Sequence, residues 1–139
     1  MQRKFLRLMQ NGGDAYDPGP REARPGWYFF YGTLSDPQFL AKIAELNETP
    51  TLVKGKVRRK CIKYWGPYRV LCWGEEIVCG VAWYAPSKEM VERLRAYETD
   101  AYAEHRLRME LENGEKVVGR AFMWNRDIEE LSEDPEEWR

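Results

Sequence analysis

Residues 28–34, with the sequence YFFYGTL, constrain the fold of this chain more than any other stretch. Consecutive aromatic residues are typical of a strand that is buried on both faces, and the Gly-Thr dipeptide after them ends that strand. Asp36-Pro37 then begins a predicted helix. A glycine at such a junction lets the backbone approach a ligand closely, and free N–H groups at the start of the helix favour an anion. The stretch therefore predicts a turn whose N–H groups bind a carboxylate.

A second segment, residues 97–102 with the sequence YETDAY, carries one glutamate between two tyrosines. It follows a predicted amphipathic helix that begins at residues 86–87. Glu98 lies near the last turn of that helix, where the helix dipole disfavours a carboxylate. This mismatch favours a functional role over that of a plain solvated glutamate. The two segments together predict a site with a backbone anion pocket and one acid/base group.

The bulk composition narrows the class of protein. A chain of 139 residues is long enough for one domain with its own core. Its net charge of −1, with 32% charged residues, argues against a strongly basic nucleic-acid footprint. The three cysteines form no C-x-x-C pair, which indicates reduced thiols and a cytoplasmic protein. No stretch approaches the roughly 18 apolar residues of a membrane span, so we expect no membrane partner.

The distribution of Gly, Pro and acidic residues divides the chain into three parts. Residues 1–25 are rich in chain breakers and are expected to form a flexible N-terminal arm. Residues 26–125 hold the periodic segments and form the predicted domain. Residues 126–139 form an acidic C-terminal tail.

Hydrophobic periodicity predicts a mixture of strands and helices within the domain. The expected strands are 26–31, 51–63, 68–73, 77–84, 106–112 and 116–124, and the expected helices are 36–46 and a segment from 86 to the region of Glu98. Ser35 or Asp36 can cap the first helix. The order of elements and their short connections predict an α+β domain with a mixed sheet, which can curl into a barrel.

Two strand patterns carry more specific expectations. The alternation in residues 51–63 gives a half-exposed strand whose basic face holds Lys54, Lys56, Arg58 and Lys60. Asn113-Gly114 predicts a type I′ hairpin turn between the last two strands. That turn would place His105, Leu107, Met109 and Leu111 on the face shared with Val118 and Phe122.

The ordered motifs resemble those of a known family. Tyr31-Gly32-Thr33-Leu34 ends the first strand, a later strand ends at residues 80–84 (GVAWY), a helix ends in Glu98 with Tyr102 four residues on, and residues 119–122 (GRAF) follow in a hairpin. In this order and over about residues 27–125, the chain is similar to the gamma-glutamylcyclotransferase-like superfamily, and more closely to its avirulence-induced-gene-like branch.

That resemblance implies a small mixed β-barrel flanked by helices, with a pocket at one end. It implies that Tyr31, Gly32, Thr33 and Leu34 form the substrate-binding loop, through the backbone N–H groups of the last three. Glu98 takes the place of the family's acid, and Tyr102 lies beside the pocket. The implied reaction is attack by the α-amine of a gamma-glutamyl unit on its own side-chain amide carbonyl, which releases 5-oxoproline and a free amine.

The residue types suit this chemistry. An α-ammonium must lose its proton before it attacks, and the leaving amine must gain one, so a single glutamate can serve both steps. Burial of Glu98 among tyrosines and aliphatic residues would raise its pKa from about 4.3 toward the working pH. No metal, cofactor or nucleotide is required. Two departures from the family pattern, Thr99 in place of a glycine and Glu104 in place of an arginine, leave the choice of substrate open.

Other site types receive less support from the sequence. His105 is the single histidine, so a metal site would need the scattered Cys61, Cys72 and Cys79, and we expect none. The basic and aromatic residues of 54–69 could hold single-stranded nucleic acid or another polyanion. A solvated strand face, partly neutralised by the acidic tail, explains the same pattern better, so we expect no nucleic-acid partner.

A third hypothesis is a non-catalytic ligand- or protein-binding module on the same fold, because a fold does not fix a function. The expected partner is a small molecule that carries a gamma-glutamyl or related amino-acid group. The sequence does not specify the oligomeric state.

Overall fold

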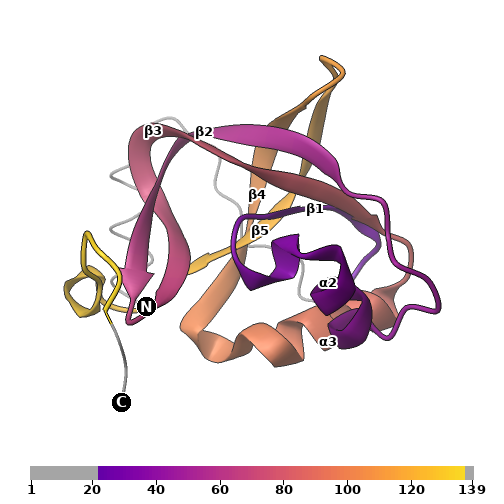
Figure 1. Cartoon of the computed structure of the whole chain (residues 1–139), viewed down its shortest axis with the longest axis horizontal. Helices are drawn as coiled ribbons and strands as arrows, with labels where there is room; N and C mark the ends of the chain where they lie inside the picture. Colours follow the sequence, from indigo (N-terminus) through magenta and orange to yellow (C-terminus); the bar gives the residue numbers. More distant parts are fainter. Residues whose placement is uncertain (1–21, 137–139) are drawn as a thin grey trace.

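The computed structural model describes residues 22–136 as a closed barrel with helices on one side (Figure 1). The strands are β1 (Gly26–Phe30), β2 (Val53–Trp65), β3 (Tyr68–Ala85), β4 (Tyr102–Leu111) and β5 (Lys116–Trp124). They follow the order β1-β3-β2-β4-β5, and β5 closes the barrel by pairing in parallel with β1 at Tyr28 and Arg120. All other neighbours are antiparallel. The predicted α+β class with a small mixed barrel flanked by helices is therefore confirmed.

Helices α2 (Pro37–Ala44) and α3 (Lys88–Glu98) lie next to each other against the barrel (Figure 1). Asp36 caps α2 by accepting a hydrogen bond from the N–H of Gln38, and Pro37 occupies the first helical position, as the sequence predicts. The Ser87 hydroxyl caps α3 by accepting from the N–H of Met90. Short 3₁₀ turns η1 (Thr33–Ser35), η2 (Thr99–Ala101) and η3 (Ile128–Glu130) follow β1, α3 and β5.

The core has two large clusters that meet at β1 and a third, smaller cluster of Val70, Cys72, Ala101 and Trp124. An interior cluster draws residues from all five strands, among them Phe29, Leu71, Met109 and Met123, each 0% exposed. An outer cluster lies between the barrel and the helices and contains Tyr28, Phe30, Leu40 and Leu94. Because successive side chains of a strand point to opposite faces, β1 contributes to both clusters in turn. This explains the uninterrupted aromatic run.

The expected break between two strands at residues 74–76 is wrong. β3 runs through this region, and β2 stays paired with it on both sides. The register shifts here, since Lys60 lies opposite both Trp73 and Glu76. Gly74 is required at this point because a Cβ would come within 2.8 Å of the Cβ of Cys61. The glycine therefore marks an irregularity inside one strand rather than a turn.

The expected basic face of β2 is also wrong at one position. Arg59 has a left-handed φ of 58° at the irregularity, and Lys60 is turned inward and is only 5% exposed. Its Nζ donates to the carbonyl of Arg58 at 3.1 Å and lies 4.4 Å from the centre of the Trp73 ring. A bulge interrupts the alternation of side chains along a strand, which the two-residue period cannot predict.

The β4–β5 turn has a different geometry from the one predicted. Gly114 has a φ of 91° but Asn113 does not have a positive φ, so the turn is not type I′. The Leu111 N–H donates to the Glu115 carbonyl, so residues 112–114 form a three-residue loop with Gly114 at its third position. Pairing is therefore shifted by one residue relative to the predicted register, and such a shift exchanges the two faces of a strand.

As a result, the predicted partners of the β4 residues change. His105 lies opposite Ala121 and Leu107 opposite Gly119. Phe122 faces the helices in the outer cluster, and Val118 is exposed.

The described part of the acidic tail contacts the end of the β2–β3 hairpin. Tyr64 and Ser132 exchange two backbone hydrogen bonds of 2.9 Å, and Lys63 forms an ion pair with Glu133. Of the predicted N-terminal arm, residues 1–21 lie outside the described residues, as do residues 137–139 of the tail. Ala23 is buried in the outer cluster. The predicted division into arm, domain and tail stays a prediction.

Candidate functional site

The turn after β1 provides two backbone donors. Tyr31 and Gly32 lead from β1 into η1, and the N–H and hydroxyl of Ser35 both donate to the carbonyl of Gly32, at 2.9 and 2.5 Å. Within residues 22–136, the N–H groups of Thr33 and Leu34 have no hydrogen-bond acceptor, as expected at the start of a helical turn. The Leu34 side chain is buried in the outer cluster, which fixes the loop. We call residues 31–34 the cradle loop.

Gly32 leaves room beside this loop. The nearest atom to a Cβ built at this position is the carbonyl oxygen of Arg69, 3.8 Å away, which is ordinary van der Waals contact. The protein therefore has space for a Cβ, and its absence increases the space available to a ligand at the cradle loop.

Glu98 is the last residue of α3 and is half-buried. Burial raises the pKa of its carboxyl group from the ordinary 4.5 to about 7. Among residues 22–136, no neighbouring cation offsets this effect. Glu98 is thus a carboxyl group that can take up and release a proton near neutral pH, which is the property required of a general acid/base.

The two tyrosines named from the sequence lie close to Glu98. Burial raises the pKa of Tyr31 and of Tyr102, and in both cases the charge of Glu98 is the second cause. The Tyr31 hydroxyl donates to the carbonyl of Phe122 at 2.6 Å, so the protein already holds it. Within residues 22–136 the Tyr102 hydroxyl makes no hydrogen bond, and its ring packs edge-on against Trp124. Tyr102 therefore retains a donor for a ligand.

A direct contact connects the cradle loop to α3. The hydroxyl oxygens of Thr33 and Tyr97 lie 2.8 Å apart. The Tyr97 ring also packs edge-on against Phe39 of α2, with ring centres 5.5 Å apart. Because Glu98 follows Tyr97, this contact brings the cradle loop and Glu98 to the same end of the barrel.

The residue after Glu98 has an unusual backbone. Thr99 adopts φ 62° and ψ −170°, a combination populated almost only by glycine. Strain of this kind costs on the order of 1–3 kcal/mol and is concentrated at functional sites. The Thr99 hydroxyl accepts a hydrogen bond from the N–H of Ala101 at 3.4 Å, which helps to hold η2.

Glu104, the second departure from the family pattern, has a structural role. Its carboxylate accepts hydrogen bonds from the Tyr28 hydroxyl and from Arg95, each at 2.7 Å, and its side chain is 7% exposed. The ion pair between Arg95 and Glu104 connects α3 to β4. Glu104 is therefore occupied within the protein and is not available to a substrate.

Among residues 22–136, no group of three or more His, Cys, Asp or Glu side chains has the arrangement of a metal site. Cys61, Cys72 and Cys79 are free thiols. No helix in the same range combines the length and apolar character needed to cross a membrane.

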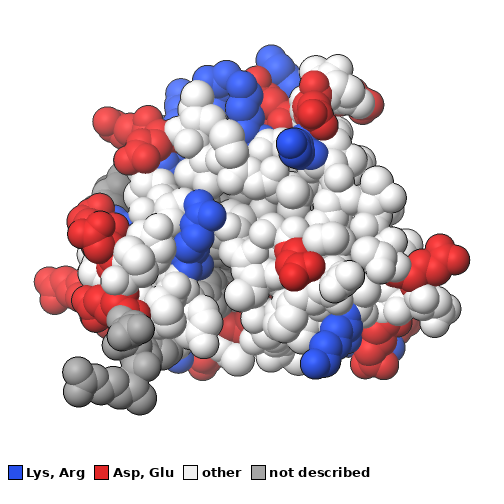
Figure 2. Space-filling view, in the orientation of Figure 1, with Lys and Arg blue, Asp and Glu red and all other residues white. Residues whose placement is uncertain are grey.

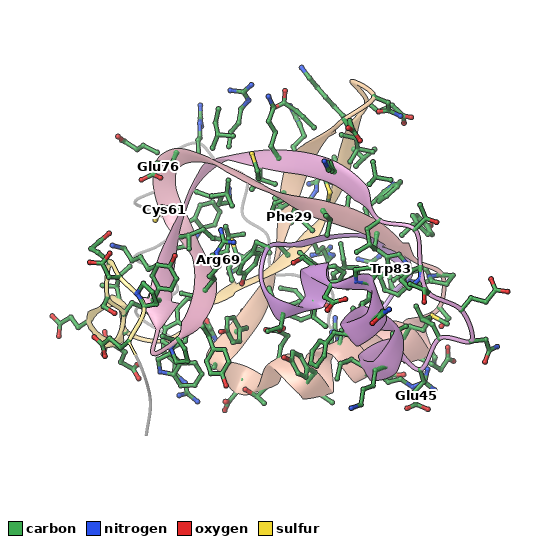
Figure 3. All side chains as sticks on the ribbon, in the orientation of Figure 1. Phe29, Glu45, Cys61, Arg69, Glu76 and Trp83 are labelled. Atoms are coloured by element: carbon green, nitrogen blue, oxygen red, sulfur yellow. The ribbon has the colours of Figure 1, made fainter. Side chains whose placement is uncertain are left out.

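Sequence reasoning missed Arg69 as a residue of this end of the barrel. Figure 2 shows a hollow in the surface beside a single basic side chain, and Figure 3 labels Arg69 at that position. In the sequence, Arg69 belongs to a run of basic residues, and nothing there separates it from the others. The continuation of β3 past Gly74 sets its position next to Gly32.

Comparison with known proteins places this chain in a family. Residues 28–139 match the model of the family described as gamma-glutamyl cyclotransferase, AIG2-like. The matched residues include the whole cradle loop, Glu98 and Tyr102. No curated protein matches the chain.

Solved structures share the fold. Two solution structures of Arabidopsis thaliana proteins have TM-scores of 0.65 and 0.63, with 22% and 19% sequence identity. The alignments cover 76% and 84% of this chain, and 73% and 76% of the Arabidopsis proteins. A structure described as a gamma-glutamyl cyclotransferase has a TM-score of 0.61 and 10% identity, with 74% of this chain and 68% of the other covered. At these identities the likeness shows the fold alone.

Proposed function

This chain belongs to the AIG2-like gamma-glutamyl cyclotransferase family, and from that premise we propose that it is a cyclotransferase that releases 5-oxoproline and a free amine from a gamma-glutamyl compound. One observation supports the proposal above the others. Glu98 is a half-buried carboxyl group with a pKa of about 7, at the end of the barrel that also carries the free N–H groups of the cradle loop.

The proposed reaction uses Glu98 twice. The ionised carboxylate accepts a proton from the substrate's α-ammonium, and the resulting amine attacks the side-chain amide carbon. A new C–N bond closes the five-membered ring. Glu98 then gives its proton to the leaving nitrogen as the original amide C–N bond breaks, and the second proton of the ring nitrogen passes to the departing amine, which leaves as an ammonium. A pKa near 7 suits both transfers, because neither form of the carboxyl group is strongly preferred at neutral pH.

The cradle loop orients the substrate in this proposal. The N–H groups of Thr33 and Leu34 bind the α-carboxylate, and Gly32 gives that group space. Ring closure is intramolecular, so restricting the substrate to the attacking geometry supplies a large part of the acceleration. The Tyr102 hydroxyl donates to the side-chain amide oxygen, where negative charge develops during attack. No cofactor takes part in these steps.

The polyanion-binding hypothesis loses support from the positions of the basic residues. Lys60 points inward, Arg58 pairs with Glu110, and Lys63 pairs with Glu133. The strand therefore lacks the continuous basic face that a nucleic acid would need. A non-catalytic binding module on the same fold is the alternative, and it differs from the proposal in releasing no product.

The test of the proposal is a direct assay for product. The full chain is incubated with a panel of gamma-glutamyl dipeptides and gamma-glutamyl amines, and 5-oxoproline is quantified. We expect time-dependent release that is proportional to enzyme concentration. Binding of these compounds without any release of 5-oxoproline would support the non-catalytic module instead.

A further inference from the structure

Arg69 lies at the mouth of the hollow with its side chain on the interior side of β3. Along this strand, Leu71 and Trp73 belong with the interior cluster, whereas Val70 and Cys72 lie in a different cluster. Side chains two residues apart share a face, so Arg69 continues the interior-facing row beyond Leu71. Unlike Leu71, Arg69 is exposed, because it stands where the barrel opens (Figures 2 and 3).

Among the described residues 22–136, the guanidinium of Arg69 has no carboxylate partner. Four other arginines, Arg58, Arg93, Arg95 and Arg126, each form an ion pair with an acidic side chain. Within residues 22–136, Arg69 makes neither a hydrogen bond nor an ion pair. A guanidinium fork matches the two oxygens of a carboxylate, so an unpaired arginine at the rim of a pocket is suited to bind one.

The groups that the proposed reaction assigns to the α-carbon indicate which carboxylate Arg69 binds. In the proposed reaction the substrate's α-amine contacts Glu98, and the α-carboxylate is bonded to the same carbon as that amine. In the proposed reaction the N–H groups of the cradle loop already bind the α-carboxylate. The carboxylate that remains for Arg69 is therefore one on the amine half of the substrate, across the scissile amide.

We infer that Arg69 binds a carboxylate on the amine half of the substrate, so that the enzyme prefers gamma-glutamyl amino acids and peptides to gamma-glutamyl derivatives of uncharged amines. This inference rests on the proposed function and adds a specificity residue to it. Charge complementarity supports this inference. The second carboxylate of the substrate would contact the Arg69 guanidinium, while the α-carboxylate contacts the backbone N–H groups of the cradle loop.

The experiment compares gamma-glutamyl-alanine with gamma-glutamyl-alaninamide, which differ only in the charge of the terminal group. For the wild type we expect kcat/KM for the acid to exceed that for the amide by roughly 10–100-fold, as for a hydrogen bond to a charged group. Arg69→Gln should reduce this ratio to within a few-fold of 1. Arg69→Lys should retain part of it, since the charge remains but the fork is lost.

Arg108→Gln is the matched control. Arg108 is an exposed arginine on β4, six residues from Tyr102, a separation of roughly 20 Å along a strand. This variant should keep the wild-type ratio. A wild-type ratio near 1 would overturn the inference even if the Arg69 variants fail to fold. An equal loss for both substrates in Arg69→Gln would also overturn it, because Arg69 would then act on the shared α-carboxylate.

A binding measurement separates this inference from the proposed function. Dissociation constants of both compounds are determined by calorimetry with Glu98→Gln, which lacks the proposed base. Tighter binding of the acid by roughly 10-fold or more supports the role of Arg69 even if the wild type releases no 5-oxoproline. Equal dissociation constants contradict it even if the wild type is an active cyclotransferase.

Discussion

The hydroxyl oxygens of Thr33 and Tyr97 lie 2.8 Å apart, and this hydrogen bond joins the cradle loop to the helix that ends in Glu98. In the proposed mechanism, the α-carboxylate and the α-ammonium of the substrate are bonded to the same carbon. Their binding groups in the protein must therefore keep a fixed separation. The contact between Thr33 and Tyr97 connects the cradle loop directly to the helix that ends in Glu98, and in the proposed mechanism it sets this separation.

Removing one of these hydroxyl groups should loosen the site without unfolding the protein. We expect Tyr97→Phe to lower kcat/KM by about 3–10-fold, the effect of one ordinary hydrogen bond, while the ring keeps its packing against Phe39. Tyr84→Phe, at a tyrosine that is 51% exposed, is the control. Steady-state kinetics of both variants check the prediction, and equal kinetics for Tyr97→Phe and wild type would contradict it.

Gly32→Ala should impair substrate binding more than folding. The nearest atom to a Cβ at this position would be 3.8 Å away, so we expect the melting temperature to stay within a few degrees of wild type. The added methyl group occupies space beside the cradle loop, and we expect KM to rise by about 10-fold or more. Calorimetric melting and KM are measured on the same preparation. An unchanged KM in the folded variant would place the carboxylate elsewhere.

Thr99→Gly should stabilise the protein. Glycine adopts φ 62° and ψ −170° without the steric cost that threonine bears there, and this gain of about 1–3 kcal/mol exceeds the added entropy of glycine in the unfolded chain, about 0.5–1 kcal/mol. Chemical denaturation should show a net increase of about 1 kcal/mol. A loss of stability would mean that the hydrogen bond from the Ala101 N–H to Thr99 matters more than the strain.

The raised pKa of Glu98 predicts how stability depends on pH. The folded state holds this proton up to about pH 7, whereas the unfolded chain releases it near pH 4.5. Between these values the folded state binds more protons, so the contribution of Glu98 to stability falls as pH rises and levels off above pH 7. Glu98→Gln removes the titrating carboxyl group and, with it, this contribution to the pH dependence of stability.

Glu98→Gln should therefore gain stability over wild type through this pH window, to a difference of about 1–3 kcal/mol above pH 7. Denaturant unfolding of both proteins from pH 4 to pH 8 measures this difference. A difference that does not change with pH would show that the Glu98 pKa is close to normal.

Part of this structure could be predicted from local sequence patterns. Asp36 and Ser87 cap helices because their side chains accept hydrogen bonds from nearby N–H groups, which is a local interaction. The aromatic run of β1 is buried on both faces, and α3 ends at Glu98, as the periodicity indicates. The resemblance to the family predicted the barrel, whereas the local patterns predicted a mixed sheet without deciding whether it closes.

The rest depends on contacts between segments that are distant in sequence. The inward turn of Lys60 follows from a register shift opposite Trp73 and Glu76, and the β4–β5 register depends on a third loop residue. Arg69 is one basic residue among several until β3 places it beside Gly32. The burial that raises the pKa of Glu98 is likewise a product of the tertiary fold.

The most direct test of the central claim is the release of 5-oxoproline by wild type and by Glu98→Gln, both verified as folded. The proposal predicts release by wild type, with a rate that rises with pH through about 7 as the carboxylate ionises. Release by Glu98→Gln should be lower by at least roughly 10²–10⁴-fold, because glutamine cannot accept the α-ammonium proton. Equal rates of 5-oxoproline release by the two proteins would contradict the assignment of Glu98 as the general acid/base.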